Sequence, residues 1–210
     1  MRHSLAAAVL AIALPLASPA FADKLSGMGL NLYGNYFNFA KANLPSAPVK
    51  VIKVGSFKVE LQHTRLSAIK KAFGGKIRSL GGESLGNWLC YHTDGSKGGP
   101  AANTWFISNQ LGGGEFTMMV AVEAAAPDKI PADCDAAPAK FAVPDLGIPG
   151  LGATTADLKA AFGAASGSKI SYRNDRPGGC SDVGQYIGYT LSGGKVVGYG
   201  AGETSIPTKH

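Results

Sequence analysis

A six-residue motif that occurs twice places the strongest constraint on how this chain folds. It reads IKKAFG at residues 69–74 and LKAAFG at residues 158–163. A second motif follows each copy in the same order, FISNQLGGG at 106–114 and YIGYTLSGG at 186–194. Two motifs that recur in one order, 89 and 80 residues apart, indicate one small structural unit used twice.

The start of the chain predicts export. A short basic segment is followed by an apolar run from Leu5 to about Leu16, and two small residues, Ala20 and Ala22, precede Asp23. This order is typical of a secretory signal peptide cleaved after Ala22. The apolar run is shorter than the ~20 residues that cross a bilayer. We therefore expect a periplasmic or secreted protein without a transmembrane segment, in an oxidising compartment.

The hydrophobic pattern predicts an α+β fold made of two tandem helix-on-antiparallel-sheet repeats. Glycine is abundant, with 29 residues in 210, which indicates frequent turns and close backbone approaches. The expected segments are a signal peptide (1–22), an N-terminal strap (23–48), a first repeat (49–123), a linker (124–140) and a second repeat (141–210).

Both copies of the first motif are expected to be short helices that end at Phe-Gly. In the first, residues 66–73 carry apolar side chains on one face, and Thr64 is the expected N-cap. In the second, residues 154–162, Thr154 and Asp157 have the spacing of a capping box. Helices this short need packing against a sheet for stability.

The remaining pattern predicts strands with glycine-rich turns between them. A turn is expected at 174–179 and a polar tail at 203–210. The expected strands are 49–54, 57–61, 76–80, 88–92, 104–110 and 115–123 in the first repeat, and 169–173, 185–191 and 195–199 in the second.

Three cysteines, Cys90, Cys134 and Cys180, allow one disulfide and one remaining thiol. We expect a Cys90–Cys134 bridge, which would attach the linker to the sheet of the first repeat. The rival Cys134–Cys180 pairing would join the two repeats. Cys180 would be free or intermolecular in the favoured arrangement.

The sequence contains no convincing catalytic constellation. Residues 82–86 match G-x-S-x-G around Ser84, but that motif requires a helix after the serine, and a strand-like segment begins at Trp88. A hydrolase using Ser84 is therefore the weakest of the functions considered. His63 and His92 are expected to be surface and structural residues, and no metal-ligand spacing or cofactor motif is present. We expect a protein that is not an enzyme and has no cofactor.

Basic residues are concentrated between residues 50 and 78, where Glu60 is the one acidic residue. If they share one side of the fold, they would meet an anionic partner; otherwise they form a solvated face. Export argues against nucleic acid. The candidate binding residues are these cations and nearby aromatic side chains: Lys50, Lys53, Lys58, Arg65, Lys70, Lys71, Tyr33, Tyr36, Phe37 and Trp88.

The segment LGATTADLKAAFG at 151–163 resembles the SmpA/OmlA-type module of outer-membrane assembly lipoproteins. The helix-plus-sheet unit in tandem is similar to the secreted β-lactamase inhibitory protein, and the whole chain resembles exported proteins of proteobacteria. The resemblance implies a non-enzymatic binding module of the cell envelope, such as a protein inhibitor or partner-binding protein. An envelope-assembly accessory protein that contacts anionic lipid is the alternative that it implies.

Overall fold

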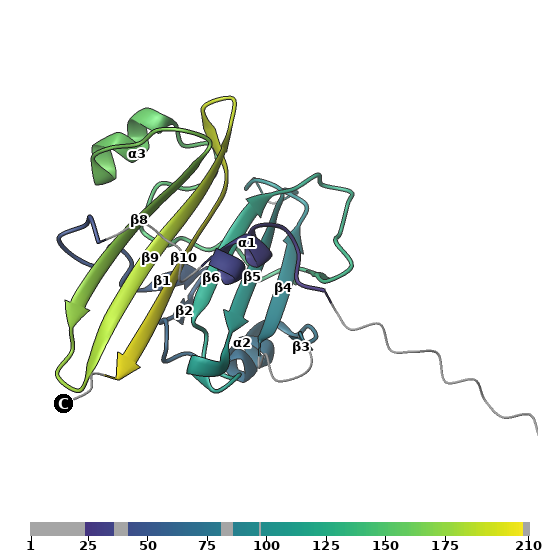
Figure 1. The fold of residues 1–210 in the computed structure, drawn as a ribbon. Helices are drawn as coiled ribbons and strands as arrows, with labels where there is room; N and C mark the ends of the chain where they lie inside the picture. The colour runs from purple at the N-terminus through teal and green to yellow at the C-terminus, as the bar shows by residue number, and fades with distance from the viewer. Residues whose placement is uncertain (1–23, 36–41, 81–85, 97, 208–210) are drawn as a thin grey trace, which may run out of the picture.

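The computed structural model describes residues 24–35, 42–80, 86–96 and 98–207. Within these ranges the fold is α+β, with three α-helices and mostly antiparallel strands (Figure 1). The predicted fold class is therefore confirmed at this level. The elements are α1 (Gly27–Asn35), β1 (Ile52–Val54), β2 (Phe57–Val59), α2 (Leu66–Phe73), β3 (Arg78–Ser79), β4 (Asn87–Thr93), β5 (Ala102–Ser108), the 3-10 turn η2 (Gln110–Gly112), β6 (Met119–Ala124), β7 (Asp135–Ala136), α3 (Thr155–Phe162), β8 (Lys169–Pro177), β9 (Ser181–Ser192) and β10 (Lys195–Pro207).

Eight strands form one sheet that runs through both halves of the chain. Its order is β3-β4-β5-β6-β10-β9-β8, and β7 pairs in parallel with β4 outside this path. The meander β4-β5-β6 meets the meander β10-β9-β8 where β6 pairs antiparallel with β10, with Ala121 opposite Gly200. The last strand of each half therefore forms the central seam of the sheet.

The helix α1 covers one face of this sheet (Figure 1). It buries Met28 and Leu32 against a cluster that contains Trp105. A Cβ atom at Gly29 would lie 2.7 Å from the Trp105 ring, so glycine is needed for this close approach. The hydrogen-bond acceptor at the start of α1 comes from a distant residue, because Ser26 N and Oγ both donate to the Asp133 carboxylate. A carboxylate is favourable at a helix N-terminus, which explains a helix in a segment expected to be an extended strap.

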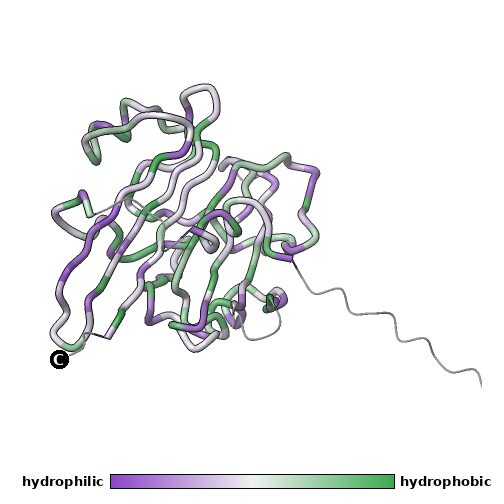
Figure 2. Tube along the Cα trace, in the orientation of Figure 1, coloured by the Kyte–Doolittle hydropathy of each residue, from purple (hydrophilic) through white to green (hydrophobic). Residues whose placement is uncertain are grey.

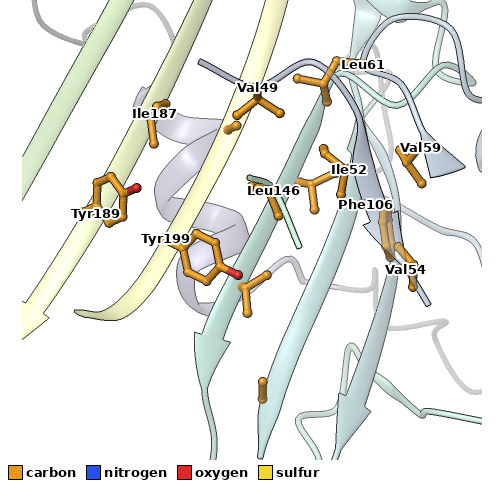
Figure 3. Close-up of a cluster of buried hydrophobic side chains, with 14 of the residues drawn as sticks. Val49, Ile52, Val54, Val59, Leu61, Phe106, Leu146, Ile187, Tyr189 and Tyr199 are labelled. Carbon is orange, nitrogen blue, oxygen red and sulfur yellow. The ribbon is translucent and has the colours of Figure 1, made fainter. Parts of the chain in front are cut away.

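The opposite face of the sheet is covered by α2, α3 and the β1–β2 hairpin. All three contribute to one large core cluster, which Figure 3 shows around the hairpin. There Ile52 and Val59 of the hairpin point toward the sheet, which contributes Phe106 and Tyr199. The hairpin turn uses Gly55 with φ of 61°, a left-handed conformation that glycine adopts without strain.

The two predicted helices are confirmed almost residue for residue. α3 has Thr154 as its N-cap and the expected capping box with Asp157. The expected cap of α2 is wrong, because Arg65 occupies the N-cap position without a side-chain cap hydrogen bond. The Thr64 hydroxyl instead accepts from the Glu60 backbone N–H at 2.9 Å. That bond closes the turn before the helix.

Two segments predicted as irregular are strands. β8 continues through the expected turn to Pro177, and β10 continues through the expected tail to Pro207. The reason is that both strands pair with the long strand β9: β8 up to Pro177 opposite Asp182, and β10 up to Pro207 opposite Ser181. The polar residue Glu203, which suggested a tail, is in fact buried. Its carboxylate accepts hydrogen bonds from other polar side chains, which makes this burial possible.

The edge strand β8 is largely hydrophilic (Figure 2) and is partly covered by the segment before β1. The backbone N–H groups of Asn43 and Leu44 donate to the Arg173 carbonyl at 2.9 and 3.0 Å. The Asn174 side chain donates to the Leu44 carbonyl at 2.9 Å. These contacts occupy edge groups that would otherwise template pairing with another strand.

The C-terminal ends of α2 and α3 are held by equivalent bonds. The Tyr91 hydroxyl of β4 donates to the Gly74 carbonyl at 2.8 Å, just past α2. The Tyr172 hydroxyl of β8 donates to the Ala164 carbonyl at 3.0 Å, just past α3. In each half, a tyrosine on the first long strand after the helix satisfies a carbonyl that the helix leaves unpaired.

The N-terminal ends of both helices pair with the chain at a Gly-Gly turn. Leu66 N donates to the Glu115 carbonyl at 2.8 Å, next to the turn at 113–114. Thr155 N donates to the Gly194 carbonyl at 3.3 Å, in the turn at 193–194. The φ angles are 59° and 71° in the first glycine pair and 56° and 75° in the second. The first residue of each helix thus donates to the chain at or next to a Gly-Gly turn, although the acceptors differ by one position relative to the motif.

The second motif does not match along its full length. Phe106 faces the cluster under α2 and α3, whereas Tyr186 faces the cluster under α1. The 3-10 turn η2 lies between β5 and its Gly-Gly turn, while β9 stays extended to Ser192. This difference shifts the alternation of side chains by one residue, so the tandem repeat itself stays a prediction.

Candidate functional site

A cleft lies where the β4–β5 connection meets residues 127–143. It has a volume of about 720 Å³. Its lining includes Pro100, Pro127, Ile130, Phe141 and Val143. We call it the strapped cleft, because one wall is a segment tied to the sheet. A mostly apolar concavity of this size with a few polar groups is typical of a small-ligand site.

The tied wall belongs to the segment expected to be a linker. The predicted Cys90–Cys134 disulfide is present and joins this segment to β4. Next to it, β7 pairs with β4, and the Ala137 backbone N–H donates to the His92 carbonyl at 2.8 Å. We call residues 133–137 the strap. The covalent bond and the backbone pairing together fix the position of this cleft wall.

An ion pair adds a third attachment of the strap. Arg78 is 6% exposed and donates from Nη1 and Nη2 to the two oxygens of Asp135, both at 2.9 Å. Lys76 N also donates to Asp135, at 2.8 Å. These hydrogen bonds, chiefly that of Arg78, lower the pKa of Asp135 below its usual value. A bidentate arginine–carboxylate pair fixes orientation as well as position.

His92 lies in the cleft but has no free ring nitrogen. Its Nδ1 is 2.8 Å from Asn103 Oδ1, and its Nε2 is 3.1 Å from the Pro127 carbonyl. Both contacts lie within the protein, and the ring is 4% exposed. The geometry supports the expected structural role, because a general base needs a nitrogen that can reach a substrate proton.

The polar groups of the cleft lie at its rim. Asp94 accepts from Ser96 N at 2.9 Å and from Ser96 Oγ at 2.6 Å. These bonds lower the pKa of Asp94, so it is a stable anion at neutral pH. Asp128 and Lys140 also line the cleft and are exposed. The arrangement offers an apolar surface with charged groups at its edge, which suits binding.

Two basic residues of the 50–78 stretch form ion pairs with the protein's own carboxylates, Arg65 at the surface and Arg78 in a buried position. Arg65 donates to Glu115 at 2.6 Å, a contact that raises the pKa of Arg65 through hydrogen bonding, and Arg78 pairs with Asp135. Neither is a free cation of a binding patch. The lysines remain exposed on three neighbouring segments: Lys50 before β1, Lys53 and Lys58 on the β1–β2 hairpin, and Lys70 and Lys71 on α2.

Of the four predicted aromatic contacts, the structure describes Trp88 and Tyr33. Trp88 is fully buried under α1, so its expected role as a partner contact is wrong for this structure. Tyr33 is half-buried against the same cluster. Tyr36 and Phe37 lie outside the described residues, as does Ser84.

Neither metal-binding nor membrane-spanning features are found in the part of the chain that the structure describes. No group of three histidine, cysteine or acidic residues there is arranged to hold a metal ion. None of its helices has the length and apolar character needed to cross a bilayer. Comparison with protein-family models, curated proteins and solved structures finds no match to this chain.

Sequence reasoning missed the strapped cleft, although one signal pointed to it. The predicted Cys90–Cys134 bridge already placed Cys134 next to the strand that carries Cys90. Prolines at 127, 131 and 138 surround that cysteine, and such residues stiffen a chain that crosses a surface. The other wall is formed by residues 94–96, 99 and 100, whose sequence has no pattern that predicts their position in the fold.

Proposed function

We propose that this protein is an exported, non-enzymatic binding module and that the strapped cleft is its binding site. The observation that carries the proposal is the cleft itself, about 720 Å³ in volume, with an apolar lining and an anchored wall. Rigid walls reduce the ordering that a ligand must impose on the protein when it binds. The occupied ring nitrogens of His92 favour binding over acid–base chemistry.

The disulfide supports the cellular location in this proposal. Bridges of this kind form in oxidising compartments such as the periplasm or the extracellular space. The Cys90–Cys134 bond therefore indicates an oxidising environment. Together with the expected signal peptide, it makes a protein of the cell envelope the natural partner or ligand source.

We also infer that the fold descends from a duplicated helix-on-sheet unit. Support comes from the paired tyrosine contacts of Tyr91 and Tyr172 and from the two Gly-Gly turns beside the helix starts. The mirrored strand order about the β6–β10 seam agrees with this origin. In this proposal only the first unit has acquired a strap, and with it a cleft.

A pair of matched substitutions tests the binding proposal. Ile130 is 50% exposed in the cleft, and Leu111 is 43% exposed outside it. Immobilised wild-type protein and the Leu111→Asp variant should retain the same envelope protein or small molecule, identified by mass spectrometry. The Ile130→Asp variant should lose it, since a buried charge opposes apolar binding. Equal retention by both variants would remove the cleft from the proposal.

A second candidate function is contact with an anionic envelope surface. Lys53 and Lys58 are directly opposite each other on the exposed side of the β1–β2 hairpin. Like charges at such positions are destabilising, and neither has an ion pair with another described residue. An anionic partner would relieve their repulsion.

Vesicle binding separates this candidate from cleft binding. Association with vesicles containing phosphatidylglycerol should weaken as salt is raised and should fall in a Lys53→Gln, Lys58→Gln double variant. A Lys195→Gln variant, on the β9–β10 hairpin, is the matched control. Vesicle binding that changes neither with salt nor with substitution of the hairpin lysines would exclude this function.

A further inference from the structure

We propose that a second cleft, beside the far ends of β8, β9 and β10, binds a small carboxylate-bearing ligand. This polar cleft has a volume of about 390 Å³ and shares no lining residue with the strapped cleft. It is bounded by the segment before β1, the residues after β2, and the sheet. The side chains used in the argument are Lys50, Glu60, His63, Arg176, Gln185 and Glu203.

The floor of the polar cleft is a buried carboxylate whose acceptors are already used. Glu203 Oε1 accepts from Gln62 Nε2 at 2.8 Å. Its Oε2 accepts from Arg176 Nη2 at 2.8 Å and from Gln185 Nε2 at 2.9 Å. With a guanidinium and two amides around it, this carboxylate holds its neighbours in place instead of repelling an incoming anion.

One wall is held by the side-chain amide of Gln185, which bonds to both backbone groups of Val49, as a neighbouring strand would. Gln185 is 2% exposed; its Oε1 accepts from Val49 N and its Nε2 donates to the Val49 carbonyl, both at 2.8 Å. These bonds attach the segment that carries Lys50. Lys50 is exposed and lines the same cleft as Arg176.

A strained residue supports the same network. Gln62 has φ of 64° and is the one non-glycine residue with a positive φ in the described ranges. Its side chain donates to Glu203 and accepts from Ser205 Oγ at 2.7 Å. Backbone strain of this kind persists where the surroundings require it and is frequent at ligand sites.

Arg176 has hydrogen-bonding capacity that the protein leaves unused. Its Nη2 donates to Glu203, whereas its Nη1 is buried with no hydrogen-bond partner among the described residues. Nη1 is enclosed by protein, but the Arg176 side chain as a whole is 41% exposed, and a planar guanidinium presents donors that suit the oxygens of a carboxylate. Lys50 supplies a second positive charge, so the ligand's acid group is expected between these two side chains.

The other side of the polar cleft offers acceptors. His63 Nδ1 is 2.9 Å from the Leu61 carbonyl, which can only accept, so Nδ1 carries the proton and Nε2 of the neutral ring is an acceptor. Glu60 is an exposed acceptor on the same side. The ligand is therefore a small carboxylate with a neighbouring hydroxyl or amino group.

Titration of the full mature chain with acetate, glycolate and inorganic phosphate, at constant ionic strength, tests this site by NMR. Glycolate should shift the amide signals of residues 46–50 and the Gln185 side chain, and should bind more tightly than acetate. Arg176→Lys should weaken glycolate binding about ten-fold, because the bidentate fork is lost. Arg173→Lys is the matched control, since Arg173 lies on the same strand but pairs with Asp175 at 2.6 Å.

Each remaining outcome counts against the site or its ligand class. Absence of glycolate shifts at these residues, or equal weakening by both arginine variants, would overturn the site. Phosphate binding tighter than glycolate would overturn the carboxylate assignment. A Lys50→Gln variant guards against misfolding of the Arg176 variant: it leaves the buried network intact and should still weaken glycolate binding.

Discussion

The two halves of the sheet carry similar helices that are stabilised in different ways. α2 buries Leu66, Ile69 and Phe73 against its half of the sheet, and residues 133–137 are tied there by a disulfide and an ion pair. α3 buries only Leu158. Cys180 of the second half is free, and β9 and β10 are the longest of the strands that the structure describes.

This difference shows two routes to a stable half-sheet. The second half relies on a long hairpin whose strand pairing, with one register shift between Val196 and Gly198, continues to Pro207. The first half has shorter strands, and its longer connections are anchored by the strap. Those anchored connections form the strapped cleft, so the stabilising device and the candidate binding site occupy the same segment.

The largest expected effect comes from removing the disulfide. The bridge joins residues 44 positions apart, for which the chain-entropy model gives about 4 kcal/mol. Cys90→Ala combined with Cys134→Ala should lower the free energy of unfolding by that order in urea denaturation. Cys180→Ala should change it little, because Cys180 is exposed and not bridged. Equal losses in both proteins would mean that the strap does not stabilise the first half.

Removing the phenylalanine at the end of each helix should also lower the free energy of unfolding more in the first half than in the second. Phe73 is 7% exposed and lies 5.1 Å, between ring centroids, from Phe141. Phe73→Ala should lower the free energy of unfolding by about 3 kcal/mol. Phe162, the matching residue of α3, is only half-buried against Tyr172, so Phe162→Ala should have a clearly smaller effect. The reverse order, measured by thermal and urea unfolding, would contradict the comparison.

The tyrosine contacts, in contrast, should be equivalent. Tyr91→Phe and Tyr172→Phe each remove one hydroxyl donor to a carbonyl next to a helix end. Each should lower the free energy of unfolding by about 1 kcal/mol. Burial raises the pKa of both hydroxyls, so they stay protonated donors at neutral pH. A large loss for one and none for the other would show that the halves differ here too.

The smallest expected effect is a dependence of the free energy of unfolding on acidic pH, which arises from the Arg78–Asp135 ion pair of the strap. Arg78 lowers the pKa of Asp135 in the folded protein. The resulting stabilisation is complete above the ordinary aspartate pKa of about 4 and is lost as pH falls through the lowered value. Asp135→Asn should therefore flatten the stability profile below about pH 4, measured by urea unfolding at each pH. An unchanged profile would exclude this ion pair as a source of acid sensitivity.

Local sequence signals predicted the parts of the fold that depend on local interactions. The spacing of apolar residues located α2 and α3, and the Thr154–Asp157 capping box is a contact between neighbours in sequence. The disulfide could be predicted from the sequence because three cysteines allow few pairings. These features need no knowledge of distant partners.

The features that sequence reasoning missed depend on distant residues. α1 begins where Asp133 accepts from Ser26, 107 positions away, so its capping residue is absent from the local sequence. β10 extends past Glu203 because Gln62, Arg176 and Gln185 satisfy that carboxylate. Both clefts are assembled from segments far apart in the sequence, which is why the candidate residues named from sequence lie largely elsewhere.

Hydrogen exchange on the wild type and the Cys90→Ala, Cys134→Ala variant tests the central claim most directly, namely that the disulfide of the strap is needed to hold the cleft wall in place. We predict faster amide exchange in residues 127–143 and 92–100 of the variant, with β8, β9 and β10 unchanged. Faster exchange spread evenly over both halves, or none at residues 127–143, would contradict the claim that the cleft depends on the strap.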